Sequence, residues 1–181
     1  MRREIDADFL ANLFDRIAIL LEIKGENPFK VNAYRRAAEN LRRETRDIVE
    51  LYKEGKLTEI PGVGKAIAQK ITEILENGKL EFYDKLTAEI PERLLSLYEV
   101  PEMGPKRIKL VWEKLGIDSV EKLEKAALEG TLRSLPGFGP KIESKILEGI
   151  MALKERRLVS RYPLGEGWDL SRIIVNRLGE F

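Results

Sequence analysis

Apolar residues recur along this chain at the spacing of an α-helix. Between residues 9 and 21 they fall three and four positions apart, which places their side chains on one helix face. This face consists of Phe9, Leu10, Leu13, Phe14, Ile17, Leu20 and Leu21. Asp6 precedes them at the position of an N-cap, so we expect the first helix to begin directly after it.

The next segments also indicate helices. Asn27-Pro28 places a capping side chain before a proline at the first helical position, so a second helix should begin there. A third, shorter helix over residues 48–52 should end at Gly55. Because no convincing run of alternating β-branched residues occurs, the sequence predicts an all-α protein.

One segment of the sequence occurs three times. Residues 55–64 align with residues 130–139 through a shared Pro-Gly-apolar-Gly motif, and the match continues into the following helix. The continued match pairs Ile67 with Ile142, Lys70 with Lys145 and Ile71 with Ile146. A weaker middle copy lies at 97–104, where Glu102 replaces the first glycine. The repeated unit is therefore a helix, a tight turn and a second helix.

The repeated turn has a chemical use beyond joining two helices. Its glycines permit a positive φ, and its apolar residue (Val63, Met103 or Phe138) can pack between the two helices. The second helix then begins with N–H groups that lack an intrahelical partner, at the positive end of the helix dipole. Such a unit can hold a phosphodiester backbone without reading its sequence. A turn that only packs helices is the alternative, which three copies disfavour.

We therefore assign phosphate binding to the glycines of the turns and to the lysine after each turn. These residues are Gly62, Gly64, Lys65, Gly104, Lys106, Gly137, Gly139 and Lys141. Because Glu102 replaces a glycine in the middle copy, we expect that copy to be the weakest phosphate site.

These repeats resemble the helix-hairpin-helix motif of DNA repair proteins. In that family the hairpin carbonyls also hold a monovalent cation, Na⁺ or K⁺, which bridges to a DNA phosphate. The resemblance implies two such carbonyl sets here. They are Thr58, Ile60 and Val63 in the first hairpin, and Tyr98, Val100 and Met103 in the second.

The segment upstream of the first hairpin extends the resemblance. Residues 27–38 together with residues 60–71 resemble the small amino-terminal lyase domain of the polymerase beta-like family X DNA polymerases. The resemblance covers about the first 155 residues. It implies a lyase-type domain over 1–85, a DNA-binding subdomain with two more hairpins over 86–155, and a tail over 156–181 like the start of a polymerase palm.

The resemblance also implies a nucleophile. In that family a lysine on the second helix of the first hairpin forms a Schiff base with an abasic sugar, and β-elimination releases the 5′ deoxyribose phosphate. The matching residue is Lys70, at the margin of a predicted buried face, where partial desolvation would favour a neutral amine. Lys30 and Tyr34 match a phosphate-binding lysine and a tyrosine of the same pocket. This chemistry needs no cofactor.

Other positions depart from the family's pattern and leave a second interpretation open. The departures are Thr58 and Ala66 for two phosphate-binding lysines, Gln69 for a carboxylate beside the nucleophile, and Phe29 for a base-stacking histidine, a role that a phenyl ring can still fill. Lys145 holds the equivalent place in the third repeat, so Lys70 could also be a lysine whose stem packs and whose ammonium is solvated. Both a lyase and a binding module without chemistry agree with these residues.

Composition narrows the chemistry. The 181 residues include no cysteine and no histidine, which excludes disulfides, thiolate metal sites and an imidazole base. The formal net charge is only +1, yet seven basic residues lie between Lys24 and Arg46 against three acids. A second cluster consists of Lys154, Arg156, Arg157 and Arg161. We expect both clusters to contact DNA, the alternative being a solvated helix face.

Together these patterns predict a protein that binds gapped, nicked or abasic DNA and its 5′ phosphate in base-excision or gap repair. A lyase activity at Lys70 is the sharper hypothesis, and a scaffold that binds other proteins is the remaining alternative. The palm's metal-binding aspartates are not recognisable, so we expect no polymerase activity without a palm domain in cis or in trans. No stretch approaches the roughly 20 apolar residues of a membrane span, so we expect a cytoplasmic protein.

Overall fold

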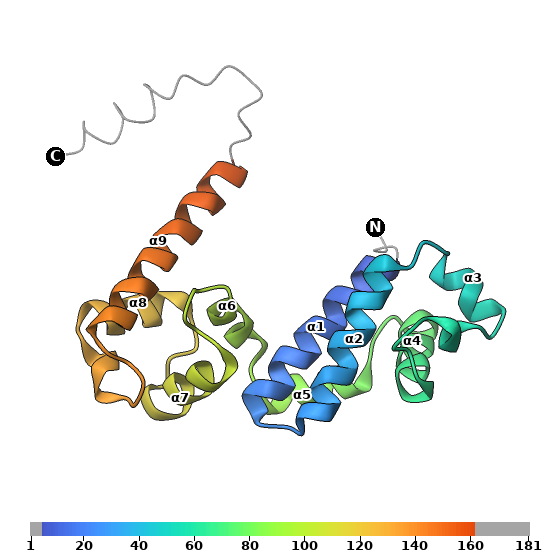
Figure 1. Cartoon of the computed structure of the whole chain (residues 1–181), viewed down its shortest axis with the longest axis horizontal. Coiled ribbons are helices and arrows are strands. Elements are labelled where there is room, and N and C mark those ends of the chain that lie inside the picture. Colours follow the sequence, from blue (N-terminus) through green and yellow to red (C-terminus); the bar gives the residue numbers. More distant parts are fainter. Residues whose placement is uncertain (1–4, 162–181) are drawn as a thin grey trace, which may run out of the picture.

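Helices build both lobes of the computed structural model, which describes residues 5–161 (Figure 1). The amino-terminal lobe contains α1 (Ala7–Lys24), α2 (Pro28–Arg43), α3 (Ile48–Lys53), α4 (Lys65–Asn77) and α5 (Glu81–Glu89). The second lobe contains α6 (Leu95–Tyr98), α7 (Pro105–Leu115), α8 (Val120–Leu128) and α9 (Pro140–Arg161). Short 3₁₀ turns lie at η1 (Leu57–Glu59), η2 (Glu92–Leu94) and η3 (Thr131–Ser134). Since residues 5–161 contain no strand, the all-α prediction is confirmed.

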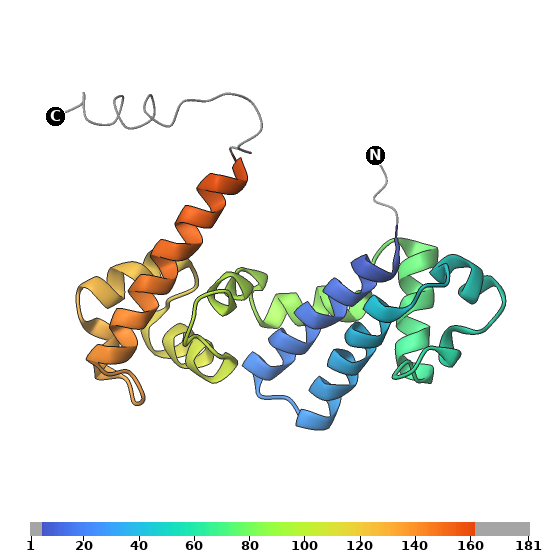
Figure 2. The same cartoon turned by 45° about the horizontal axis from the view of Figure 1, so that its top comes forward.

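Side-chain caps fix the starts of the first two helices, as predicted. The Asp6 carboxylate accepts a hydrogen bond from the Phe9 N–H at 2.8 Å, and the Asn27 side-chain oxygen accepts one from the Phe29 N–H at 2.9 Å. Helices α1 and α2 then pack along each other (Figure 2). Their contact buries Phe14 and Ile17 completely, and each such side chain contributes about 1.5–3 kcal/mol of burial free energy.

All three repeats form the same hydrogen-bonded turn. One residue of each turn is left-handed: Gly62, Glu102 and Gly137 have φ values of 76°, 69° and 81°. The N–H of the next residue donates to the carbonyl three positions earlier, at 3.0, 3.1 and 3.2 Å. That next residue is the predicted apolar one, Val63, Met103 or Phe138, and all three are buried. The middle repeat therefore keeps the turn although it lacks the glycine.

Helix α1 belongs to the amino-terminal lobe but packs against helices of both lobes. It contacts α5 in its own lobe and both α6 and α7 in the other. The Lys109 ammonium donates to the Lys24 carbonyl at the end of α1, at 3.3 Å. Arg16 forms an ion pair with Glu92, whose carboxylate also accepts a hydrogen bond from the Tyr83 hydroxyl at 2.7 Å.

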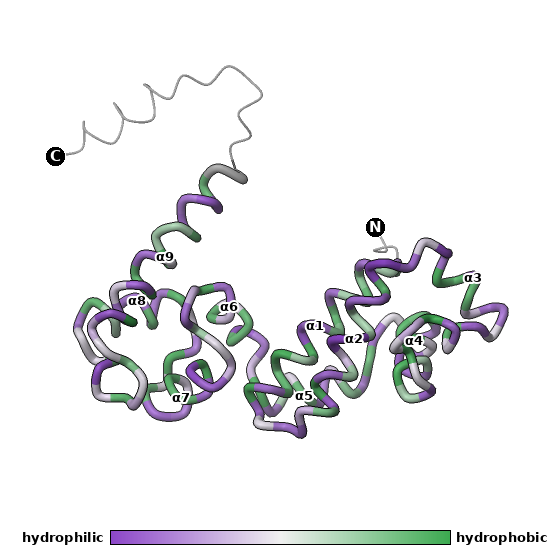
Figure 3. The backbone as a smooth tube through the Cα atoms, in the orientation of Figure 1, coloured by the Kyte–Doolittle hydropathy of each residue, from purple (hydrophilic) through white to green (hydrophobic). Residues whose placement is uncertain are grey.

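Hydrophobic and hydrophilic stretches follow one another along the helices of both lobes (Figure 3). This pattern is expected when each helix turns one face to a core.

The second hairpin packs directly on α9. Gly149 lies where this helix meets Pro101, and a Cβ added at Gly149 would come within 2.4 Å of the Pro101 Cδ. The absence of a side chain at Gly149 therefore lets the turn and the helix approach closely.

Within residues 5–161, no helix is long and apolar enough to cross a membrane. The segment that resembles the start of a palm lies, from residue 162 onward, outside the described residues.

Replacing Gly62 with alanine should destabilise the protein more than the same change at Gly137. Both are left-handed, but a Cβ at Gly62 would lie 3.3 Å from the Arg36 carbonyl oxygen, whereas a Cβ at Gly137 would meet nothing within 4 Å. The left-handed conformation alone costs an alanine about 1–2 kcal/mol, and crowding of α2 should add about 1–2 kcal/mol in G62A. Urea denaturation followed by circular dichroism measures both losses. Equal losses would contradict close packing of the first hairpin on α2.

Candidate nucleic-acid interface

The first hairpin presents unpaired backbone N–H groups at the start of α4. Its N-cap, Gly64, has no side chain that could accept a hydrogen bond, and its carbonyl receives the N–H of Ala68 at 2.9 Å. Among the described residues, the N–H groups of Lys65, Ala66 and Ile67 have no acceptor. These donors, with the positive end of the helix dipole behind them, can bind an anion.

The other two hairpins offer fewer free N–H groups. Pro105 and Pro140 open α7 and α9, and proline has no N–H. In the third hairpin the Gly139 carbonyl accepts from both Ile142 and Glu143, at 3.0 Å each. The first hairpin is therefore the strongest main-chain anion site of the three.

The lysine after each turn is free of carboxylate partners in the part of the chain that the structure describes. Lys65, Lys106 and Lys141 are exposed in the first turn of their helices. The turn glycines Gly62, Gly64, Gly104 and Gly137 are exposed too, and Gly139 is half-buried. The predicted phosphate-binding residues thus lie where a ligand can reach them.

Many residues of the two predicted basic clusters form ion pairs. Six of the seven basic residues between Lys24 and Arg46 form ion pairs. These pairs are Lys24–Glu89, Lys30–Glu26, Arg35–Glu22, Arg42–Asp15, Arg43–Glu39 and Arg46–Glu44. In the second cluster Lys154 pairs with Glu124 and Arg157 with Glu99, while the Arg161 side chain lies outside the described residues. A DNA contact at these paired residues would have to displace a carboxylate of the protein itself.

Lys70 lies over an aromatic ring. Its ammonium is 4.8 Å from the centroid of the Phe82 ring, and the ammonium of Lys30 is 5.4 Å from the same centroid. The Phe82 ring stacks on Tyr34, with 5.9 Å between centroids and 6° between planes. Tyr34 in turn meets Phe14 edge-on at 5.9 Å. The structure therefore brings Lys30, Tyr34 and Lys70 together, as the resemblance implied.

Phe82 is a site residue that sequence reasoning missed. It lies at the start of α5, outside every hairpin repeat, and it is only half-buried. The sequence did offer one signal for this residue. It is a large aromatic residue in the first turn of the helix that follows α4 and its capping glycine. Its position holds both ammonium groups on one ring by cation–π attraction, about 0.5–1 kcal/mol for each exposed pair.

Lys145 has different surroundings from Lys70, although the two are equivalent in the repeat. The Lys145 ammonium pairs with Glu102 at 2.8 Å, whereas Lys70 has no carboxylate partner among residues 5–161. A lysine side chain held in an ion pair must first leave its carboxylate before it can reach an aldehyde carbon. Lys70 is therefore the better placed of the two for nucleophilic chemistry.

Two more residues complete the surroundings of Lys30. Phe29, next to it, is 85% exposed and offers a free ring for stacking on a base. Glu26 pairs with the Lys30 ammonium at 3.1 Å, and its pKa is lowered, first by a hydrogen bond from the Asn27 N–H and then by Lys30. A phosphate at Lys30 would have to displace this carboxylate.

Glu102 is the one non-glycine residue with a positive φ in the described part of the chain. Its Oε1 accepts from Lys145 at 2.8 Å, its Oε2 from Arg107 at 3.1 Å, and its carbonyl from Arg107 at 2.7 Å. Lys145, and secondly Arg107, hold the pKa of this carboxyl below its usual value. A negative charge thus lies within the middle hairpin, where the other two hairpins have a glycine.

The carbonyl oxygens assigned to a monovalent cation lie in the first two turns and just before them, since Thr58 belongs to η1 and Tyr98 ends α6. Those of Ile60 and Val100 each accept one N–H, from Val63 at 3.0 Å and from Met103 at 3.1 Å. A carbonyl oxygen has a second lone pair, so these atoms fit a weakly bound monovalent ion. Within residues 5–161, no group of three or more acidic side chains could hold a metal ion.

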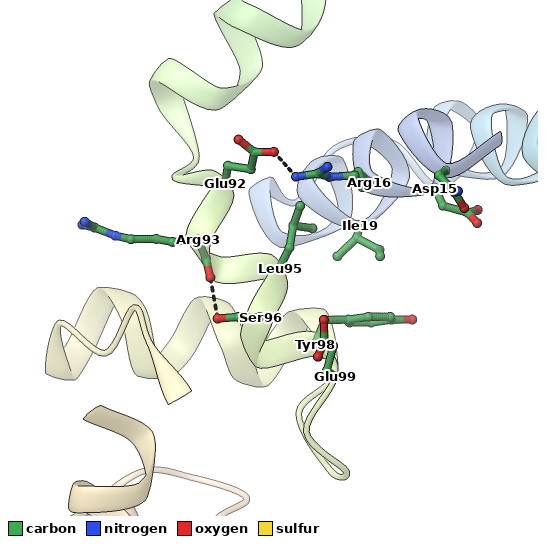
Figure 4. A pocket seen from close by; sticks show the side chains of 10 residues that line it. Asp15, Arg16, Ile19, Glu92, Arg93, Leu95, Ser96, Tyr98 and Glu99 are labelled. Atoms are coloured by element: carbon green, nitrogen blue, oxygen red, sulfur yellow. Dashed lines mark hydrogen bonds and ion pairs between the residues drawn. The ribbon is translucent and has the colours of Figure 1, made fainter. Parts of the chain in front are cut away.

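A groove of about 810 Å³ lies between α1 and the segment from η2 to α6 (Figure 4). Arg16 and Glu92 pair along it, and the Ser96 hydroxyl donates to the Arg93 carbonyl at 2.7 Å. Its lining carries charges of both signs and includes none of the hairpin donors, so it is separate from the anion sites.

Comparison with known proteins agrees with this arrangement. Residues 7–80 match the model of a helix-hairpin-helix domain, and residues 92–152 match that of a SAM-like helix-hairpin-helix tandem, both DNA-binding modules. The chain is 33% identical over 172 residues to the DNA polymerase/3′-5′ exonuclease PolX of Bacillus subtilis (strain 168). That alignment covers 95% of this chain and 29% of the relative, so the chain spans less than a third of that protein's length.

The phenol of Tyr34 should ionise only in strong alkali. Burial raises its pKa from 10.0 to about 12, because the ring is 4% exposed and a phenolate would lose solvation. The burial of this group therefore contributes fully to stability below pH 10 and loses that contribution as pH rises toward 12. Ultraviolet titration of the wild type and of Y34F isolates this group. Ionisation near pH 10 would show that the ring is solvated and that the aromatic stack is open.

Proposed function

Because the chain is related to the family X DNA polymerases through its two helix-hairpin-helix domains, we propose that it binds gapped or nicked DNA at a 5′ phosphate in base-excision or gap repair. The observation that carries the proposal is the start of α4. There, three N–H groups without acceptors among the described residues stand beside Lys65, and Lys70 lies on the same helix.

The contacts would be independent of base sequence. Backbone N–H groups and lysine ammonium groups reach phosphate oxygens, which are the same at every nucleotide. Lys30 would hold the terminal 5′ phosphate, and the exposed Phe29 ring could stack on the base beside the gap. A protein with a site for a terminal phosphate and a free stacking ring would bind DNA ends and gaps better than continuous duplex.

A Schiff-base lyase reaction is the finer part of the proposal. The neutral Lys70 amine would attack the C1′ aldehyde of a ring-opened abasic sugar, and loss of water would leave a C=N bond. Loss of a C2′ proton would then break the C3′–O bond and release DNA that carries a 5′ phosphate. Hydrolysis of the C=N bond would free the sugar phosphate and regenerate Lys70. The support is that the Phe82 ring holds Lys70 and Lys30 together, with Lys70 free of any carboxylate in residues 5–161.

Binding without chemistry is the second candidate function. The observation that favours it is the missing carboxylate at Gln69, which is exposed on α4 one residue before Lys70. A base that takes the C2′ proton is therefore not assigned to this helix. The hairpins would serve DNA binding in the same way under both candidates.

A cation and a catalytic partner belong to the same proposal. Na⁺ or K⁺ would be held by the carbonyls of Thr58, Ile60 and Val63, and in the second hairpin by those of Tyr98, Val100 and Met103. Such an ion would supply a positive charge between the turn and a phosphate. A polymerase palm, in cis or in trans, would fill the gap that the hairpins hold.

Salt dependence tests the DNA contacts of the hairpins. We expect affinity for a 5′-phosphorylated gapped duplex to fall with salt, and K65A to reduce the slope of log K against log salt by about one unit, since one phosphate contact is lost. K114A is the matched control, because Lys114 is an exposed lysine in the last turn of α7, far from that helix's hairpin. Fluorescence anisotropy measures both. Equal slopes for K65A, K114A and the wild type would contradict a phosphate at the first hairpin.

Borohydride trapping tests the chemistry. On a duplex with an incised abasic site, the wild type should form a covalent adduct and K70A should lose at least about tenfold in trapping rate, because the amine is the nucleophile. K114A, which changes an exposed lysine in the last turn of α7, should keep the adduct. An adduct that survives in K70A, or that none of the three proteins forms, would leave DNA binding as the function.

A further inference from the structure

Two basic side chains from different hairpins converge on the Glu102 carboxylate. Arg107 reaches it from α7 at 3.1 Å, and Lys145 reaches it from α9 at 2.8 Å. Arg107 also touches the third hairpin: its Nη2 donates to the Gly137 carbonyl at 3.3 Å, and its guanidinium carbon lies 5.6 Å from the centroid of the Phe138 ring. The two cations therefore lie at the interface between the second and third hairpins.

The turn itself does not explain why a glutamate occupies this position. The equivalent left-handed residues of the other hairpins are Gly62 and Gly137, and a glutamate adopts this conformation only with strain. Compared with glycine, Glu102 adds a carboxylate with one negative charge. Both carboxylate oxygens of Glu102 accept hydrogen bonds, one from Arg107 and one from Lys145. A carboxylate and a phosphate are interchangeable ligands for guanidinium and ammonium groups.

We propose that Arg107 and Lys145 form a phosphate-binding site between the second and third hairpins, which Glu102 fills until a DNA phosphate displaces its carboxylate. The inference rests on the proposed DNA binding and deepens it, because it adds Arg107 and Lys145 to the phosphate contacts assigned to the glycines of the turns and the lysines that follow them. The ligand is a phosphodiester group of the DNA backbone. Glu102 accordingly lowers the affinity for DNA.

The surrounding packing allows the carboxylate to leave while the site keeps its shape. Pro101 packs against Gly149 of α9, and Met103 is buried on the other side of Glu102. The turn is thus held to α9 by apolar contacts that do not involve the carboxylate. Arg107 also keeps its bonds to the carbonyls of Glu102 and Gly137. Only the Glu102 side chain, 27% exposed, has to rotate away.

Substitution of Glu102 tests the inference against a purely structural link. E102Q removes the charge but retains the side-chain length, and E102G removes the carboxylate together with the strained conformation. E99Q is the matched control: Glu99 lies in the same lobe, pairs with Arg157 of α9 at 3.2 Å, and its change alters net charge by the same amount. The probe is a duplex with a single-nucleotide gap and a 5′ phosphate, followed by fluorescence anisotropy over a salt series.

The expected result is tighter binding by E102Q and E102G than by E99Q, by at least about threefold at moderate salt, since the internal competitor is gone. The gain should disappear when R107A and K145A are added to E102Q. Added to E99Q, the same two changes should lower affinity less. Thermal unfolding by circular dichroism accompanies each variant, so that loss of fold is recognised.

Two outcomes overturn the inference and separate it from the proposed function. If the wild type binds the duplex but E102Q and E102G bind no tighter than E99Q, Glu102 is only a link between the hairpins. If neither the wild type nor E99Q binds even at low salt, the proposed DNA binding fails and the phosphate site fails with it.

Discussion

The left-handed residue in each turn is the constraint on which the rest of the structure depends. It reverses the chain within a few residues, so that the next side chain (Val63, Met103 or Phe138) enters the core and the following helix starts at the surface. A right-handed residue at Gly62 would take the first turn away from its close approach to Arg36 of α2 and would redirect α4. The start of α4 would then lose both its exposure and its orientation. Exposed N–H donors and a buried apolar anchor are thus two results of one backbone conformation.

Charge distribution decides which basic residues are available to a ligand. Most cations on α1 and α2 are held by carboxylates of the same lobe, and surface pairs of this kind contribute about 0–1 kcal/mol each to stability. The lysines that follow the three turns have no such partner in the part of the chain that the structure describes. A net charge of +1 therefore averages over two kinds of cation: many lie in ion pairs on the helices, and the lysines beside the main-chain donors of the turns do not. The middle hairpin differs, because its Glu102 carboxylate forms ion pairs with Arg107 and Lys145.

Local features of the sequence were enough to predict the helices and the turns. The caps at Asp6 and Asn27, the ending of α3 near Gly55, and the repeated turns depend on residues close together in the chain, and all are confirmed. Distant contacts were out of reach. The ion pairs of α2 use Asp15 and Glu22 of α1, Phe82 reaches Tyr34 from a helix beyond the first hairpin, and Glu102 meets Lys145 across 43 positions. Periodicity reports which face of a helix is buried but does not report which element lies against it.

The most direct test of whether the turns hold DNA through their main chain is an NMR titration with gapped, 5′-phosphorylated duplex. It measures the change in the chemical shift of each backbone amide. The largest shifts are predicted at the N–H groups of Lys65, Ala66 and Ile67, with smaller ones at the start of α9. They should weaken with added salt and persist in K65A, because the donors are backbone groups. Shifts confined to the ion-paired face of α1 and α2, with none at the hairpins, would contradict a hairpin-held phosphate.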